Sequence, residues 1–286
     1  MSETVELHAA PSLTALYGRA LVAPALPGGG DELPDRRLVL RGARIAEDHV
    51  AAYARVCGFA LRTEVPGTYP HVLAFPLHMS LMTDRAFPFS VLGLVHVANR
   101  IEVRAPIAVG AELDIATWAE SLRPHRRGRQ FDIVTEASAG GSQVWRESST
   151  YLKQGGGEDS GSGSEREETG APGELPASAE WRLPGDIGRR YAEVSGDRNP
   201  IHMHSLPARL FGFPGAIAHG MWTKARCLAA FDGRVPATYA IEAEFRSPLR
   251  IPGRARLRSG RDGDGWAFRV ESPDGERVHL TGSLSG

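Results

Sequence analysis

Two side chains that can exchange protons, Asp197 and His202, stand five residues apart in the stretch that begins at Tyr191. Pro200 fixes its own φ and pushes Asn199 towards an extended backbone, so the chain bends between them. A helix would place residues five apart on different faces, whereas a bend can bring both side chains to one point. A carboxylate and an imidazole that meet at one water molecule can take a proton from it and deliver a proton to a neighbouring atom. The amide of Asn199 could orient the carboxylate.

Gly220 adds a third part to this chemistry. The apolar pattern from Ala218 to Phe231 predicts a buried helix that begins near this glycine. A backbone N–H in the first turn of a helix has no partner within the helix and lies at the positive end of the macrodipole. Because glycine has no side chain, a thioester carbonyl can approach that N–H closely. Loss of one such donor commonly costs about 3 kcal/mol of transition-state stabilisation.

Each of these residues also has a simpler interpretation when it is taken alone. A single Asp or His in a loop is more often a helix cap or a surface group, and a single glycine more often serves packing. We interpret His219 and His204 as structural or supporting groups, and His78 in the first half as structural. The prediction of a catalytic site therefore depends on the whole string of residues.

The composition is that of an ordinary globular protein, with 286 residues, 42% apolar, 23% charged and a net charge of −1. This balance favours neither nucleic acid nor a membrane surface as partner. The acidic first residues do not resemble a signal peptide, and no apolar run reaches the length of a membrane span. Cys57 and Cys227 lie apart in apolar segments, which is typical of a reducing compartment. We therefore expect a cytoplasmic protein.

The order of patterns predicts an α+β fold in two halves. In the first half an amphipathic helix and a short helix from about His78 to Thr83 precede four strand-like segments. Two Xaa-Pro pairs, ending at Pro70 and Pro76, suggest irregular chain before the short helix. Residues 154–175 are rich in Gly, Ser and Glu, which predicts a flexible linker. The expected domains are thus 1–153 and 176–286.

The two halves are related in sequence, which indicates a tandem duplication. Tyr53-Ala-Arg-Val-Cys-Gly-Phe59 matches the stretch from Tyr191 to Asp197, and Leu77-His78-Met79 resembles Ala218-His219-Gly220. Phe59 stands where the second copy has Asp197, and no Asn-Pro-x-His follows it. Only the second half is therefore expected to carry the chemistry.

The string from Tyr191 to His202, followed by Gly212-Phe213 and Ala218-His-Gly-Met221, resembles the (R)-specific hydratase motif of the MaoC-like dehydratase family. That family has the hot-dog fold, in which an antiparallel sheet wraps a central helix. The two-half layout resembles the double-hot-dog 3-hydroxyacyl thioester dehydratases of actinobacterial fatty-acid elongation. The resemblance implies a catalytic role for Asp197 and His202 and an oxyanion donor at the Gly220 backbone. It also implies that the degenerate first half shapes the pocket for the acyl chain.

The activity implied by the resemblance is reversible hydration of trans-2-enoyl thioesters, or dehydration of (R)-3-hydroxyacyl thioesters. The reaction needs neither a metal nor a redox cofactor. The coenzyme A or acyl carrier protein is part of the substrate. Two alternatives remain at this point: a hot-dog acyl thioesterase, and a non-catalytic module that binds acyl thioesters. The basic hairpin Arg123–Arg129 could meet coenzyme A phosphates or a carrier protein, or form a solvated turn. The sequence leaves open the acyl chain length, the thioester carrier, the physiological direction and whether two chains pair as a homodimer.

Overall fold

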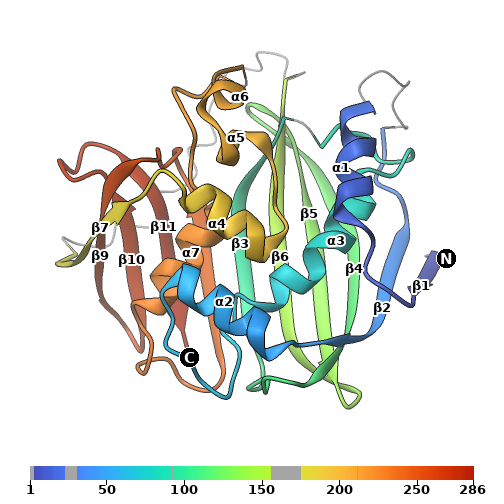
Figure 1. Cartoon of the computed structure of the whole chain (residues 1–286), viewed down its shortest axis with the longest axis horizontal. Coiled ribbons are helices and arrows are strands. Elements are labelled where there is room, and N and C mark those ends of the chain that lie inside the picture. Colours follow the sequence, from blue (N-terminus) through green and yellow to red (C-terminus); the bar gives the residue numbers. More distant parts are fainter. Residues whose placement is uncertain (1–2, 23–30, 92, 156–174, 211) are drawn as a thin grey trace.

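The computed structural model describes residues 3–22, 31–91, 93–155, 175–210 and 212–286, which Figure 1 colours along the chain. The helices are α1 (Leu13–Val22), α2 (Glu47–Cys57), α3 (Pro70–Met82), α4 (Ile187–Ser195), α5 (Pro200–Met203), α6 (Ser205–Leu210) and α7 (Gly220–Ala229). The strands are β1 (Glu3–Leu7), β2 (Arg36–Arg44), β3 (Leu94–Val103), β4 (Glu112–His125), β5 (Gly128–Ala139), β6 (Ser142–Gln154), β7 (Ala177–Leu183), β8 (Tyr239–Phe245), β9 (Gly253–Asp262), β10 (Gly265–Glu271) and β11 (Val278–Ser285).

All the described strands belong to one sheet, in the order β1-β2-β4-β5-β6-β3-β8-β11-β10-β9-β7. The first half contributes β2-β4-β5-β6-β3, and the second half repeats the same order in reverse as β8-β11-β10-β9-β7. The halves meet where β3 pairs antiparallel with β8, with Ile101 opposite Ile241. Each half is therefore one copy of the same unit, and the copies are joined edge to edge. The prediction of an α+β tandem repeat is confirmed.

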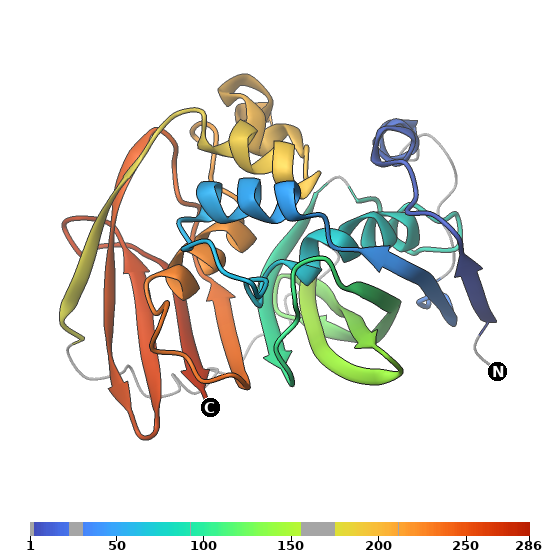
Figure 2. The same cartoon turned by 60° about the horizontal axis from the view of Figure 1, so that its bottom comes forward.

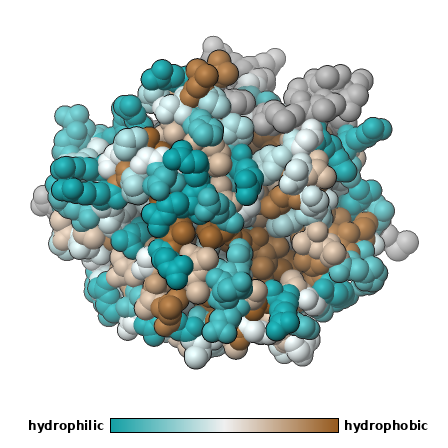
Figure 3. Space-filling model, viewed as in Figure 1, coloured by the Kyte–Doolittle hydropathy of each residue, from teal (hydrophilic) through white to brown (hydrophobic). Residues whose placement is uncertain are grey.

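The helices lie on the inner face of the curved sheet, as Figures 1 and 2 show from two directions. The central helix of the first half, α3, contacts β2, β4 and β5, and that of the second half, α7, contacts β8. Helix α2 contacts both α4 and α7, so a helix of the first half covers part of the second. Figure 3 shows apolar surface gathered in the middle of this face, with hydrophilic residues around it.

The helix predicted at His78–Thr83 is present but was predicted too short, because α3 already begins at Pro70 and continues through Phe75-Pro76. A proline in the first turn has no hydrogen bond to lose. Pro76 lies inside the helix, where a proline costs about 3 kcal/mol. Ten of the thirteen residues of α3 are buried, so the burial of apolar side chains offsets this cost. Tertiary packing therefore overrides the local signal.

The structure supports the first match between the halves. Helix α2 ends at Gly58 and helix α4 at Gly196, both with left-handed backbone (φ 81° and 73°). Phe59 and Asp197 are the next residues in the two copies, so they occupy the same step of the repeated unit. The repeated tyrosines Tyr53 and Tyr191 pack against each other, with ring centroids 6.2 Å apart.

The second match, between Leu77–Met79 and Ala218–Gly220, is wrong. The two central helices begin at Pro70 and at Gly220, which makes these two residues the structural counterparts. The short helices α5 and α6 stand between α4 and α7, and the described chain between α2 and α3 has no such helices. This insertion shifts the spacing that the sequence comparison relied on. Residues 156–174, which hold most of the predicted linker, lie outside the described residues.

Candidate active site

The bend predicted at Pro200 is present and begins helix α5. Asn199 is the N-cap residue, and its side-chain oxygen accepts a hydrogen bond from the Ile201 N–H at 3.3 Å. His202 follows within the same short helix, while Asp197 lies just beyond the end of α4. The sequence folds this way because a left-handed glycine ends one helix and an Asn-Pro pair starts the next within a few residues.

The Asp197 carboxylate is held by two donors on the same oxygen. The Tyr17 hydroxyl donates to Oδ1 at 3.1 Å, and the Asn199 N–H donates to it at 3.2 Å. Burial opposes ionisation, but the neighbouring imidazoles of His219 and His202 and these hydrogen bonds lower the pKa of Asp197 below its ordinary value. The expected orienting role of Asn199 thus belongs to its backbone, because its side chain caps α5.

His202 is fixed in one tautomer. Its Nδ1 lies 2.9 Å from the carbonyl oxygen of Ile217, which can only accept, so Nδ1 carries the proton. Burial lowers the pKa of His202, although the Asp197 charge and the bond to Ile217 oppose the shift. The neutral ring therefore has an unprotonated Nε2 that can act as a base. The ring stacks on His219, with centroids 3.7 Å apart.

His219 supports this pair without using its own charge. Its Nε2 donates to the backbone carbonyl of Asp197 at 2.9 Å and lies 3.8 Å from Oδ2 of the same residue. Burial and the nearby His202 lower the pKa of His219 to about 3, so the ring is neutral. The interpretation of His219 as a supporting residue agrees with this geometry. It ties the loop of Asp197 to the start of α7.

Gly220 is the first residue of α7, as predicted. A β-carbon at this position would lie 2.9–3.1 Å from three ring atoms of Phe245, which is closer than real contacts allow. The glycine is therefore needed for packing against β8, independently of any chemistry. As the first residue of the helix it also has a backbone N–H without an intrahelical partner.

Tyr17 is a site residue that the sequence did not reveal. It lies on α1, outside the repeated unit, and also accepts a hydrogen bond from the Arg198 N–H at 2.7 Å. Burial and the Asp197 charge raise the pKa of Tyr17 above its ordinary value, so the hydroxyl stays protonated and donates to Asp197. Nothing in the apolar pattern around Tyr17 distinguishes it from a core residue. Its role depends on a contact across 180 residues of sequence.

These groups open onto one cavity of about 610 Å³ that both halves line. Asp197, His202 and Gly220 lie on the wall formed by the second half. The wall formed by the first half is mostly apolar and includes Phe75, Met79, Met82, Val91, Leu94 and Val97. A cavity of this size and lining fits a small apolar ligand with a reactive end among the polar groups.

Two sets of side chains have the residue types of a metal site, with ligand atoms within 4.8 Å of one another. The first set consists of Asp197, His202 and His219. The Nε2 of His219 already donates its proton to the backbone carbonyl of Asp197. In the second set, His71 Nδ1 lies 2.8 Å from the Glu147 carboxylate and His78 Nε2 lies 2.7 Å from the Thr135 hydroxyl. These hydrogen bonds use the nitrogens that a metal would need. The sequence-based expectation of no metal stays a prediction.

The basic stretch 123–129 forms the predicted hairpin between β4 and β5. Arg123 pairs with Asp132 at 2.8 Å, and Arg129 lies 3.6 Å from Asp31. Arg127 lines the cavity. Ion pairs therefore occupy part of the hairpin, and Arg127 is its link to the cavity.

The fold and the site together define a hot-dog protein with an acid–base pair facing a helix N-terminus. The MaoC-like domain family matches residues 172–275. Over 257 residues the chain is 38% identical to 3-hydroxyacyl-thioester dehydratase X of Mycobacterium tuberculosis, covering 90% of this chain and 91% of that protein. The chain therefore belongs to the MaoC-like dehydratase family.

Solved structures show the same relationship. The crystal structure of HtdX from Mycobacterium tuberculosis matches 88% of this chain and all of that chain, with a TM-score of 0.78 and 37% identity. A second Mycobacterium tuberculosis protein, described as having a double hotdog fold, matches at a TM-score of 0.55 and 13% identity over 92% of this chain and 97% of that chain. The latter likeness concerns the fold alone. Among the described residues, no helix has the length and apolar character to cross a membrane.

Proposed function

We propose that this protein is a hydro-lyase that interconverts trans-2-enoyl and (R)-3-hydroxyacyl thioesters. The observation that carries the proposal is that an ionised carboxylate, a neutral imidazole with an unprotonated Nε2 and a helix-start glycine line one cavity. The family membership and the name of the mycobacterial relative agree with it. The (R) configuration is part of the proposal and rests on the resemblance of the motif.

In the hydration direction, Asp197 and His202 hold one water molecule between them. Nε2 of His202 takes one proton of this water, and the free oxygen of Asp197 accepts a hydrogen bond from the other, which stays on the oxygen as it attacks C3 of the enoyl group. The pair then returns one proton to C2, so the elements of water are divided between C3 and C2. Dehydration follows the same steps in reverse. Near neutral pH both groups already have the charge that this step requires. Burial keeps His202 neutral, and the groups around Asp197 keep its carboxylate ionised.

The thioester carbonyl accepts a hydrogen bond from the Gly220 N–H in this proposal. As C3 is attacked, negative charge develops on the carbonyl oxygen. The N–H and the positive end of the α7 macrodipole stabilise that charge. A donor fixed at a helix start needs no reorganisation when the charge appears.

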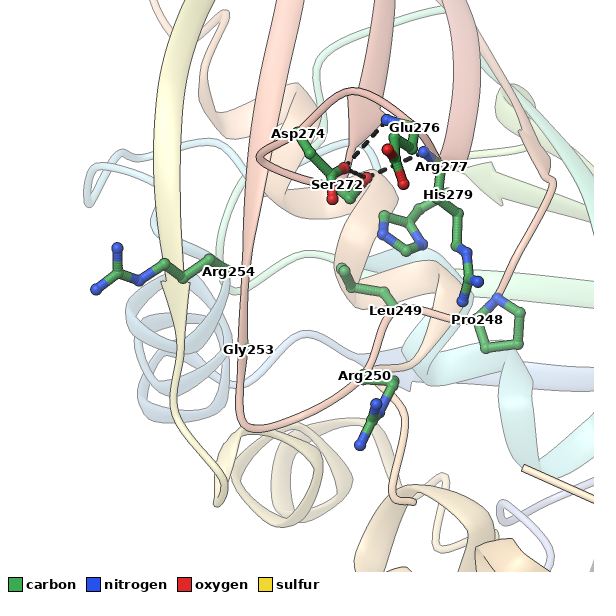
Figure 4. A pocket seen from close by; sticks show the side chains of 10 residues that line it. All are labelled: Pro248, Leu249, Arg250, Gly253, Arg254, Ser272, Asp274, Glu276, Arg277 and His279. Atoms are coloured by element: carbon green, nitrogen blue, oxygen red, sulfur yellow. Dashed lines mark hydrogen bonds between the residues drawn. The ribbon is translucent and has the colours of Figure 1, made fainter. Parts of the chain in front are cut away.

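The character of the two ends of the cavity suggests how the substrate lies. The first half offers mainly apolar side chains for the acyl chain. At the other end, Pro248, Leu249 and His279 also line a neighbouring hollow of about 320 Å³. Figure 4 shows this hollow with Arg250, Arg254 and Arg277, none of which forms an ion pair with a described residue. We propose that the pantetheine arm leaves along this end, with its phosphate near Arg250 and Arg277.

The decisive test compares wild type with Asp197→Asn and His202→Ala in the hydration of crotonyl-CoA. Removal of a general acid–base group lowers kcat by about 10²–10⁴-fold, so both variants should lose nearly all turnover. Circular dichroism and the melting temperature should show that both remain folded. If a folded variant kept near wild-type rates, the assignment of the site would be wrong.

The same assay separates the alternative functions. Hydration consumes the enoyl absorbance and leaves the thioester intact, whereas a thioesterase releases a free thiol. A binding module would bind crotonyl-CoA without any turnover. We also propose a cytoplasmic location, which agrees with the free, buried thiols of Cys57 and Cys227.

A further inference from the structure

A buried histidine–carboxylate pair lies in the half that lacks the catalytic motif. His71, the second residue of α3, places Nδ1 2.8 Å from a carboxylate oxygen of Glu147 on β6. Glu147 is fully buried, and the Asn99 side chain donates to the same oxygen at 2.6 Å. A buried carboxylate persists only when its charge is compensated and hydrogen-bonded. Burial opposes ionisation, but the neighbouring His71 and His78 and the Asn99 bond hold the pKa of Glu147 below its ordinary value.

This arrangement fixes the His71 ring. An ionised carboxylate can only accept, so Nδ1 of His71 carries the proton that is shared with Glu147. Lys224 on α7 secures the opposite side of the network. Its ammonium group donates to the Asn99 side-chain oxygen and to the backbone carbonyls of Asn99 and Ile241, both at 3.0 Å. Residues from both halves therefore hold the imidazole in one orientation.

The His71 ring forms part of the wall of the proposed substrate cavity. His71 lines the cavity beside Phe75 and Met79. Its second nitrogen, Nε2, has no hydrogen-bond partner among the residues that the structure describes. An unsubstituted alkyl chain lying against Nε2 would displace water and offer no hydrogen bond in return. An unsatisfied polar group of this kind costs about 1–3 kcal/mol.

We propose that His71 is a specificity residue whose Nε2 binds a hydroxyl group on the acyl chain beyond C3. The preferred substrates would then be hydroxylated enoyl or 3-hydroxyacyl thioesters. A hydroxyl suits this position because it can donate to an unprotonated Nε2 or accept from a protonated one. The inference rests on the proposed function, since it concerns the acyl end of the same cavity. A site built for a hydroxyl discriminates strongly against the analogue that lacks it.

The test uses trans-2-enoyl-CoA substrates of equal chain length, one unsubstituted and the others with a single hydroxyl at successive carbons beyond C3. Wild type should turn over at least one hydroxylated substrate with kcat/KM about 5–150-fold above the unsubstituted one. The ratio of the two kcat/KM values is the measure, because losses of stability affect both substrates equally.

The variant that tests His71 must not leave the buried Glu147 carboxylate without its imidazole partner. We therefore compare Glu147→Gln, which keeps the imidazole, with the double variant His71→Phe/Glu147→Gln. The double variant should lose the preference for the hydroxylated substrate, measured as the ratio of the two kcat/KM values whatever its absolute rates. The inference is overturned if wild type prefers none of the hydroxylated substrates or if the double variant keeps the preference. Turnover of the unsubstituted substrate by wild type tests the proposed function separately.

Discussion

The two halves of this protein have the same strands and central helices in the same order, but they differ at the start of the central helix. In the second half this helix begins with Gly220, which lines the cavity. In the first half it begins with Pro70, which has no N–H at all. The residue that begins the first central helix therefore has no N–H to donate at the place where the second half has Gly220. This difference lies in the backbone and is independent of any catalytic side chain.

Two further differences separate the halves. Phe59 stands at the step of Asp197 and stacks on Tyr53, with ring centroids 6.3 Å apart. The helices α5 and α6, which bring His202 to the site, have no counterpart between α2 and α3 in the described chain. Donor, acid and base are thus all absent from the first half, which instead contributes the apolar wall and His71. In the function that we propose, one copy of the fold performs the chemistry and the other shapes the ligand site.

Replacing Gly220, which begins α7, by a proline like the one that begins α3 should have the largest effect on activity. Gly220→Pro removes the N–H, while Gly220→Ala keeps it, and both add a β-carbon against Phe245. His219 has ψ 139°, which a following proline tolerates. We expect kcat/KM of the proline variant to lie about 10²-fold or more below that of the alanine variant. Equal activities would show that the Gly220 N–H does not stabilise the oxyanion.

Tyr17→Phe should have a smaller effect, because it removes support for Asp197 and leaves the acid–base pair in place. A hydrogen bond to a charged group contributes about 1.5–3 kcal/mol, so we expect a tenfold or larger fall in kcat/KM towards crotonyl-CoA. The loss should be less than that of Asp197→Asn. Tyr151→Phe, on the first-half side of the cavity, serves as a comparison. If the Tyr17→Phe enzyme were as active as wild type, α1 would not contribute to catalysis.

The double variant Phe59→Asp/Asp197→Asn tests whether a carboxylate in the first half can replace the one lost from the second half. We expect no recovery in the hydration assay, because neither a histidine on a bend nor a free helix N–H accompanies residue 59. The loss of the stacked ring should lower the free energy of unfolding by about 1–2 kcal/mol, measured by urea denaturation. Recovered turnover would show that the two halves differ less than the structure indicates.

The pH dependence should show the smallest effect. The active enzyme needs neutral His202, and burial lowers the pKa of this residue below its ordinary value of about 6.5. Protonation and loss of activity should therefore occur only below that value as the pH falls. We expect kcat/KM to stay within about twofold of its plateau down to pH 6.5. A midpoint above pH 7 on the acid side would contradict the assigned environment of His202.

Much of this organisation could be predicted from local patterns. The hairpins and alternating strands that form most of the sheet have short-range signals, and so does the long helix after Gly220. The first central helix was predicted too short because its two prolines give the local signal of irregular chain, whereas burial decides the outcome. The match of Leu77–Met79 to Ala218–Gly220 failed because α5 and α6 change the spacing of one copy.

The sequence by itself determined the acid–base pair. Asp197 and His202 lie on either side of one proline bend, and short-range backbone preferences around Pro200 and Gly196 set their approach. Only the tertiary structure decided what surrounds them. Tyr17 reaches Asp197 across 180 residues, and His71 reaches Glu147 across 76. No local preference encodes such contacts, because they join segments far apart in the chain that meet only in the folded protein.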